Sequence, residues 1–104
     1  MSHDVYVIEL DSATLEERKF REANPQHDRR MDCLYVGETG KSRAKRFDEH
    51  KSGIKANKYV RRYGLRLRAD LHRHYEFERC PEAREAEVEL AQELRAKGYA
   101  VWQH

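Results

Sequence analysis

The chain has 104 residues, of which 38% are apolar and 38% charged, and its mean hydropathy is −1.08. These values predict one domain, residues 1–104, with a small core and a strongly ionic surface, because so short a chain has no room for a second core. No stretch approaches the roughly 20 apolar residues of a membrane span, and the N-terminus lacks the pattern of a signal peptide. We therefore expect a cytoplasmic protein without a membrane partner.

The charge is distributed unevenly along the sequence. The formal net charge is only +2, yet residues 41–68 contain 11 basic and 2 acidic side chains. Such a block is typical of a phosphate-binding surface, and the alternative is a solvated helix face. The candidate nucleic-acid-binding side chains in this block are Lys41, Lys45, Lys55, Lys58, Tyr59, Arg61 and Arg62, with Tyr59 available for stacking.

Two β-prone segments lie in the first half of the chain. Residues 5–10 are β-branched and aromatic, and residues 33–37 form a second apolar run that ends at a glycine. Between them, Thr14 and Glu17 have the spacing of a capping box, which predicts a short helix that ends before Asn24 and Pro25. We expect an antiparallel strand pair interrupted by an insert at about residues 12–32.

The second half predicts three helices and one strand. Ser42 is a plausible N-cap for a helix that ends at Gly53, and a short basic helix over residues 56–63 precedes Gly64. Residues 65–71 alternate apolar and polar, as in a half-buried strand, and apolar residues then recur at helical spacing from Ala83 to Gly98. The pattern predicts an α+β fold: a three-stranded antiparallel sheet flanked by helices, with room for a short extra strand at residues 99–102.

The turn after the second strand has two interpretations. The string Gly37-Glu38-Thr39-Gly40-Lys41-Ser42 is similar to a phosphate-binding P-loop. That motif needs a glycine five positions before its second glycine, and Tyr35 occupies the position here. The spacing therefore excludes a nucleotide cofactor and favours an interpretation that begins at Tyr35.

The residues around this turn follow a recognisable order. Tyr6 lies in the first strand and Tyr35-Val36-Gly37 in the second, and Arg46 and His50 follow on one face of the next helix. In the last helix Glu87 precedes Leu90 by three residues and Leu94 by seven. In this order and rough spacing the chain resembles the GIY-YIG nuclease superfamily. Asp4 departs from the usual glycine of the first motif, and Lys45 is an alternative to Arg46 because the spacing from Tyr35 is one residue longer than in several members.

The resemblance implies a metal-dependent endonuclease that hydrolyses phosphodiester bonds in DNA, with RNA as a further substrate to test. The implied catalytic residues are Tyr6, Tyr35, Arg46, His50 and Glu87, with Glu87 as the ligand of Mg²⁺ or Mn²⁺. Tyr6 would help to activate the attacking water and Arg46 would steady the phosphate.

A tyrosine is a poor base at its ordinary pKa of about 10, so we expect His50 to accept its proton. Gly37 would let the backbone turn tightly beneath the phosphate, which makes it a further candidate for nucleic-acid binding. The rival hypothesis is a binding module with the same fold and basic surface that does not cleave.

Overall fold

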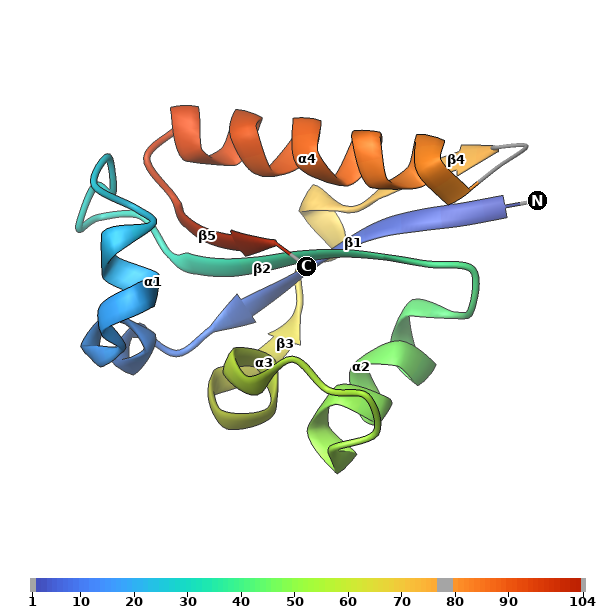
Figure 1. The fold of residues 1–104 in the computed structure, drawn as a ribbon, viewed down its shortest axis with the longest axis horizontal. Helices are drawn as coiled ribbons and strands as arrows, with labels where there is room; N and C mark the ends of the chain where they lie inside the picture. The colour runs from blue at the N-terminus through green and yellow to red at the C-terminus, as the bar shows by residue number, and fades with distance from the viewer. Residues whose placement is uncertain (1, 77–79, 104) are drawn as a thin grey trace.

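β1 (Ser2–Leu10) is the central strand of a mixed five-stranded sheet. The computed structural model describes residues 2–76 and 80–103 of the chain, and Figure 1 shows their arrangement. β1 pairs antiparallel with β2 (Cys33–Thr39) on one side, and β5 (Ala100–Gln103) pairs parallel with β2. On its other side β1 pairs with β3 (Gly64–Leu67) near its end and with β4 (Arg73–Glu76) near its start.

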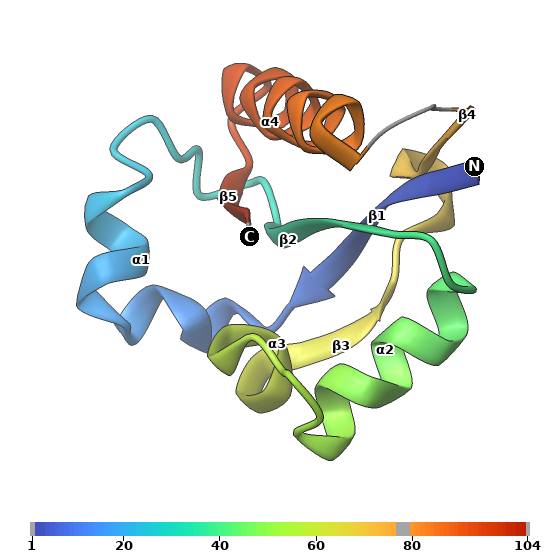
Figure 2. The same cartoon turned by 45° about the vertical axis from the view of Figure 1, so that its right-hand side comes forward.

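Helices cover both faces of this sheet. α4 (Cys80–Ala96) lies along one face, whereas α2 (Arg43–Ser52) and α3 (Lys58–Tyr63) lie on the other, as the two views in Figures 1 and 2 show. The insert between β1 and β2 forms a 3₁₀ helix, η1 (Ser12–Glu16), and α1 (Arg18–Glu22), which packs beside α3. None of the helices in the described part of the chain has the length and apolar character needed to cross a membrane.

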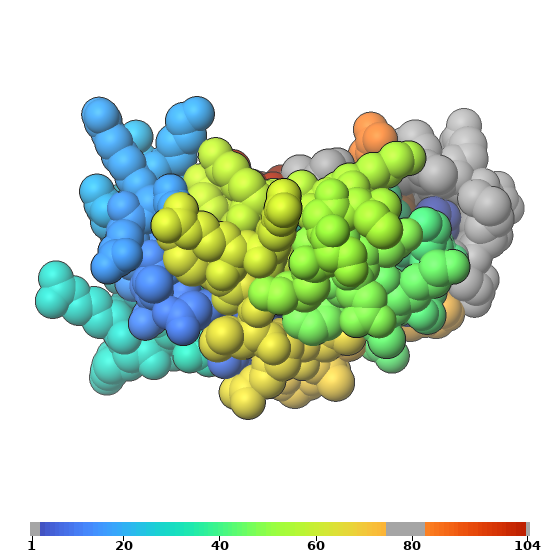
Figure 3. Space-filling view, turned by 90° about the horizontal axis from the view of Figure 1, so that it is seen from below, coloured from blue at the N-terminus to red at the C-terminus, as the bar shows by residue number. Residues whose placement is uncertain are grey.

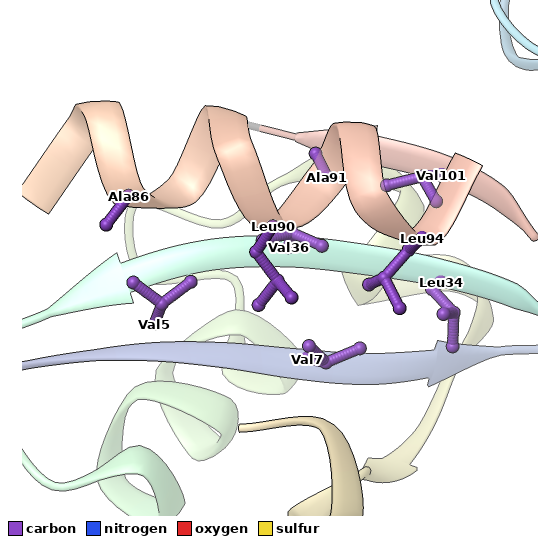
Figure 4. Close-up of a cluster of buried hydrophobic side chains, with 9 residues drawn as sticks. All are labelled: Val5, Val7, Leu34, Val36, Ala86, Leu90, Ala91, Leu94 and Val101. Carbon is purple, nitrogen blue, oxygen red and sulfur yellow. The ribbon is translucent and has the colours of Figure 1, made fainter. Parts of the chain in front are cut away.

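The core is divided into two clusters by the sheet. Alternate residues of β1 and β2 point to opposite faces, since successive side chains of a strand do so. Figure 4 shows the cluster beneath α4, formed by Val5, Val7, Leu34, Val36, Ala86, Leu90, Ala91, Leu94 and Val101. Tyr6, Ile8 and Tyr35 belong to the second cluster, on the side of α2 and α3. Both central strands are therefore buried on two faces, which holds Tyr6 and Tyr35 firmly in place.

Local signals predicted both ends of α2 and the C-terminal end of α3, whereas α3 begins at Lys58 rather than at residue 56. The Ser42 hydroxyl accepts the backbone N–H of Lys45 at 3.1 Å, which caps α2, and Gly53 ends that helix in the left-handed region at φ 84°. Asn57 caps α3 by accepting the N–H of the second residue of that helix, and Gly64 follows its last residue. These signals are local, so the sequence alone reveals them.

The α+β class and the antiparallel pairing of the three predicted strands are confirmed, but the sheet has five strands rather than three, and β5 pairs parallel with β2. The predicted strand over residues 65–71 ends at Leu67, and residues 69–71 form the short 3₁₀ helix η2 (Ala69–Leu71) before β4 begins. At the break, the backbone N–H of Val7 donates to Nδ1 of His72 at 3.0 Å. His72 thus accepts the N–H that a backbone carbonyl of a continuous strand would otherwise accept. The chain beside β1 is therefore divided into two short strands, β3 and β4.

The predicted capping box is also wrong. The carboxylate of Asp11 caps η1 by accepting the N–H of Ala13, and the Thr14 hydroxyl donates to the carbonyl of Asp11. Glu17 instead accepts the hydroxyl of Tyr63 at 2.8 Å. Because a distant residue occupies Glu17, the insert folds as two short helices rather than one.

Candidate active site

Two tyrosines and a histidine meet on the α2 side of the sheet. Tyr6 lies opposite Gly37 in the strand pair and Tyr35 opposite Ile8, so their rings are diagonal neighbours with centroids 6.2 Å apart. His50, from α2, lies with Nε2 2.9 Å from the Tyr6 hydroxyl and with its ring 5.4 Å from that of Tyr35. All three side chains are almost fully buried, with at most 1% exposed.

Gly37 makes space for the first of these rings. A Cβ added at Gly37 would lie 2.5 Å from the Tyr6 hydroxyl oxygen and 3.0 Å from Cε1 of Tyr35. Such contacts are far inside van der Waals distance. A side chain is excluded at Gly37 because the Tyr6 ring packs across the glycine.

A cleft of about 500 Å³ opens beside the two tyrosines. Its lining residues come from the start of β1, the end of β2, the following turn, α2 and the α2–α3 connection: His3, Tyr6, Tyr35, Glu38, Thr39, Gly40, Lys41, Arg46, Glu49, Ile54 and Lys55. Arg46 lines this cleft, whereas Lys45 is exposed and is not among the described residues that line it. The geometry therefore favours Arg46 over Lys45 as the basic side chain of the site.

Arg46 is held by the connection between α2 and α3. Its Nη2 donates to the carbonyl of Lys55 at 3.0 Å, and Nη1 lies 3.4 Å from the carbonyl of Ile54. Nη1 is also 3.5 Å from Glu49, which accepts Nζ of Lys41 at 3.0 Å. These contacts with Lys41, and then with Arg46, lower the pKa of Glu49. The guanidinium is thus oriented by two carbonyls and one carboxylate at the rim of the cleft.

The two phenols differ in their proton affinity. Burial raises the pKa of Tyr6 to about 12, while Arg46 and the hydroxyl of Tyr35 act in the opposite direction. Burial raises the pKa of Tyr35 further, and the neighbouring Tyr6 and Glu87 add to the effect. Tyr6 is therefore the phenol that loses its proton more readily, because Tyr35 donates to it and Arg46 lies close by.

Glu87 reaches this region from α4. It is 3% exposed, whereas Glu85 and Glu89 on the same helix are exposed. Its charge raises the pKa of both Tyr6 and Tyr35, so the carboxylate lies within electrostatic reach of the phenols. It is not among the described residues that line the cleft, and the described residues contain no group of three or more His, Cys, Asp or Glu side chains suited to a metal.

Most of the predicted nucleic-acid contacts lie on one face. Figure 3 shows this face, where α2 and α3 lie side by side. Lys45, Lys58, Arg61 and Arg62 are exposed there, and Lys41 and Lys55 are exposed at the cleft. Tyr59 is a correction: it is 2% exposed and its ring packs 4.9 Å from that of Trp102 and 5.6 Å from that of Phe20. It stabilises the core and cannot stack on a base.

Sequence reasoning did not assign several of the residues that line the cleft. His3 and Glu38 line it as a pair, with Nδ1 of His3 3.1 Å from a Glu38 oxygen. Ile54 also lines it, although 55% of this side chain is exposed. An apolar residue between Gly53 and Lys55 was the available signal, because it breaks an otherwise polar connection.

The chain was compared with protein-family models, with curated proteins and with solved structures. None of the three comparisons gives a match.

Proposed function

We propose that the chain is a metal-dependent endonuclease that hydrolyses phosphodiester bonds in DNA. The observation that carries this proposal is that Tyr6, Tyr35 and Arg46 line one cleft beside the basic face of α2 and α3. The buried His50 contacts both tyrosines from behind them. Perturbed groups that converge on a cleft are typical of functional sites.

Each of these side chains has a role in phosphodiester hydrolysis. The Tyr6 oxygen, once ionised, takes a proton from the attacking water, and the Tyr35 hydroxyl donates to that oxygen. Arg46 contacts the nonbridging oxygens of the phosphate, where negative charge develops in the transition state. The neighbouring Lys41 and Lys55 hold the flanking phosphates at the rim.

Glu87 is the residue that would hold a hard divalent cation, although it is not among the described residues that line the cleft. Glu87 is the only acidic side chain that is buried among the described residues, and its charge already acts on both phenols. One carboxylate suits Mg²⁺ or Mn²⁺, because such ions keep several waters and take further ligands from substrate phosphates. When bound at Glu87, the cation would neutralise charge on the phosphate and lower the pKa of the attacking water.

One observation favours the rival function, a nucleic-acid-binding module without cleavage. The pKa of Tyr6 is about 12, so its phenol is protonated at neutral pH. An active site therefore needs the arriving phosphate and cation to lower that pKa. A binding module needs no such change.

Incubation of the protein with supercoiled plasmid and with branched DNA separates the two functions. We expect cleavage in the presence of Mg²⁺ or Mn²⁺ and none in excess chelator. Tyr6→Phe removes only the hydroxyl and is the matched control, so it should bind the same DNA and cut it far more slowly. Binding without cleavage under every metal condition would establish the binding module, and cleavage by Tyr6→Phe at the parental rate would exclude the proposed site.

A further inference from the structure

His50 has a hydrogen-bonding partner at each of its ring nitrogens. Nδ1 lies 3.0 Å from the backbone nitrogen of Asn57, and Nε2 lies 2.9 Å from the hydroxyl oxygen of Tyr6. The ring is 1% exposed, so these contacts are shielded from water. The two contacts are chemically different, and the difference decides where the imidazole carries its proton.

The backbone N–H of Asn57 can only donate, so Nδ1 of His50 must be the acceptor and cannot carry a proton while that bond exists. A neutral imidazole carries one proton, which must then lie on Nε2. The Nε2–H group donates to the oxygen of Tyr6 at 2.9 Å. A general base at His50 would instead have to accept the hydroxyl proton of Tyr6 at Nε2.

We propose that the Asn57 amide holds His50 in its Nε2–H tautomer, and that His50 is a positioning residue that stabilises the Tyr6 phenolate by donating to it. The tautomer depends only on the geometry, whereas its catalytic use rests on the proposed function. His50 is then not the acceptor of the Tyr6 proton. That proton leaves to solvent in the adjoining cleft, and the phenolate later takes one proton from water.

The same short connection also orients the guanidinium. Residues 53–57 join α2 to α3, and their carbonyls at Ile54 and Lys55 accept from Arg46. Lys55 adopts φ 45°, a left-handed conformation that is uncommon outside glycine. The connection therefore sets the direction of both His50 and Arg46, and this explains why a loop without catalytic side chains matters for the site.

Nitrogen NMR of the intact protein tests the tautomer without any substrate. We expect the His50 ring to show a protonated Nε2 and an unprotonated Nδ1 at neutral pH, with the signals assigned by their loss in His50→Gln. A ring with its proton on Nδ1, or a doubly protonated ring, would overturn the proposal. This measurement stands even if the protein proves not to cut DNA.

A pair of variants at position 57 isolates the amide. Asn57 has φ −71° and ψ 133°, so proline fits the backbone angle there and removes the N–H. Asn57→Pro also removes the side-chain cap of α3, and Asn57→Ala removes the cap alone. We expect Asn57→Ala to retain the Nε2–H tautomer and Asn57→Pro to show a mixture of both. A retained tautomer in a folded Asn57→Pro protein would show that the amide does not set it.

Substitutions of His50 itself test the catalytic half of the proposal. His50→Gln offers an amide N–H near the position of Nε2 but cannot accept a proton at neutral pH, whereas His50→Ala offers neither. On DNA cleavage we expect His50→Gln to stay within about tenfold of the parent and His50→Ala to lose at least about 100-fold, the usual lower range for such groups. Equal loss in both variants, with the tautomer confirmed by NMR, would show that donation to Tyr6 is not how His50 contributes to cleavage. Absence of cleavage in the parent would instead exclude the proposed function.

Discussion

The proposed metal requirement depends on the buried carboxylate of Glu87. Glu87→Gln keeps the shape and removes the charge, so cleavage should fall by about 100-fold or more while the fold and DNA binding persist. Glu85→Gln is the matched control on the exposed side of α4 and should cut at the parental rate. The measurement is plasmid cleavage at several Mg²⁺ concentrations.

Two results would contradict this prediction in different ways. A dead Glu85→Gln beside an active Glu87→Gln would move the metal site to Glu85. Activity that survives in both variants and in excess chelator would remove the metal from the mechanism.

Arg46 should not tolerate replacement by lysine. Arg46→Lys should be nearly as damaging as Arg46→Ala, because a point charge cannot reproduce the planar fork of a guanidinium. Lysine also has fewer donors for the carbonyls of Ile54 and Lys55. Lys45→Ala, at the exposed neighbouring position, should be mild. Cleavage rates of the three variants check this order, and the reverse ranking would assign the phosphate contact to Lys45.

Spacing along the sequence predicted which side chains share a helix face, but not what lies against them. Tyr59 was expected on the surface because the residues around it are basic, yet Phe20 and Trp102 enclose it. At Gly37 the structure adds a requirement that the sequence does not show, because the ring of Tyr6 fills the space that a side chain would take. In each case the deciding partner is distant in sequence, and no local pattern encodes it.

At the scale of elements, α2 and α3 present the basic face. We expect DNA affinity to fall steeply with salt, with a log-log slope of roughly −0.9 for each phosphate contact. Alanine at Lys55, Lys58, Arg61 and Arg62 should flatten this slope by several units, since all four side chains are exposed. Fluorescence anisotropy with labelled duplex DNA at increasing salt measures it.

A control of equal charge separates this face from net charge alone. The control removes four exposed basic side chains outside α2 and α3: Arg18, Arg30, Arg84 and Lys97. This variant should bind with nearly the parental slope. Equal flattening in both variants would mean that the whole surface, rather than the face of α2 and α3, attracts DNA.

Helix ends could be predicted from sequence where the signal is a cap and could not where a distant residue intervenes. The ends at Ser42, Gly53 and Asn57 follow from their own hydrogen bonds and backbone angles. The break between β3 and β4 follows from His72, which binds an amide of a strand 65 residues earlier. Alternation over residues 65–71 indicates a half-buried chain, but it contains no information about that interruption.

Burial of Tyr6 makes the stability of the whole molecule sensitive to alkaline pH. The unfolded phenol loses its proton near its ordinary pKa of 10.0, whereas the folded one keeps it up to about 12. The unfolded chain then binds fewer protons, so the free energy of unfolding falls as pH rises through this window. The loss is on the order of 2 to 3 kcal/mol, at about 1.4 kcal/mol for each pKa unit.

Urea unfolding at several pH values between about 8 and 12, followed by circular dichroism, measures how the free energy of unfolding depends on pH. Tyr6→Phe lacks the ionisable group, so its stability should decline less steeply above about pH 10. The comparison concerns the slopes of the two curves, whatever their offset. Parallel curves for parent and variant would show that Tyr6 does not ionise differently in the two states.

The arrangement of the sheet was the least predictable property of the molecule. Residues 99–102 were expected at most as a short extra strand, and the structure pairs β5 parallel with β2 along Cys33–Val36. A parallel neighbour requires the chain to cross the sheet, and α4 provides that crossover. Strand direction depends on this three-dimensional path, whereas the strand propensity of a segment depends only on its own residues.

The central position of β1 also has a consequence for the newly made chain. β1 is synthesised first, but its partner strands β2, β3 and β4 begin at residues 33, 64 and 73. The helix α4, which covers one face of the sheet, begins at residue 80. Contacts between residues so far apart in sequence form slowly, because the entropy of closing a long loop is lost before the contact stabilises the chain. Tyr6 therefore lacks its strand partner Gly37 and its contact with His50 until those residues have been synthesised. The pairing of β1 is complete only after most of the chain has been synthesised, because β4 begins at residue 73.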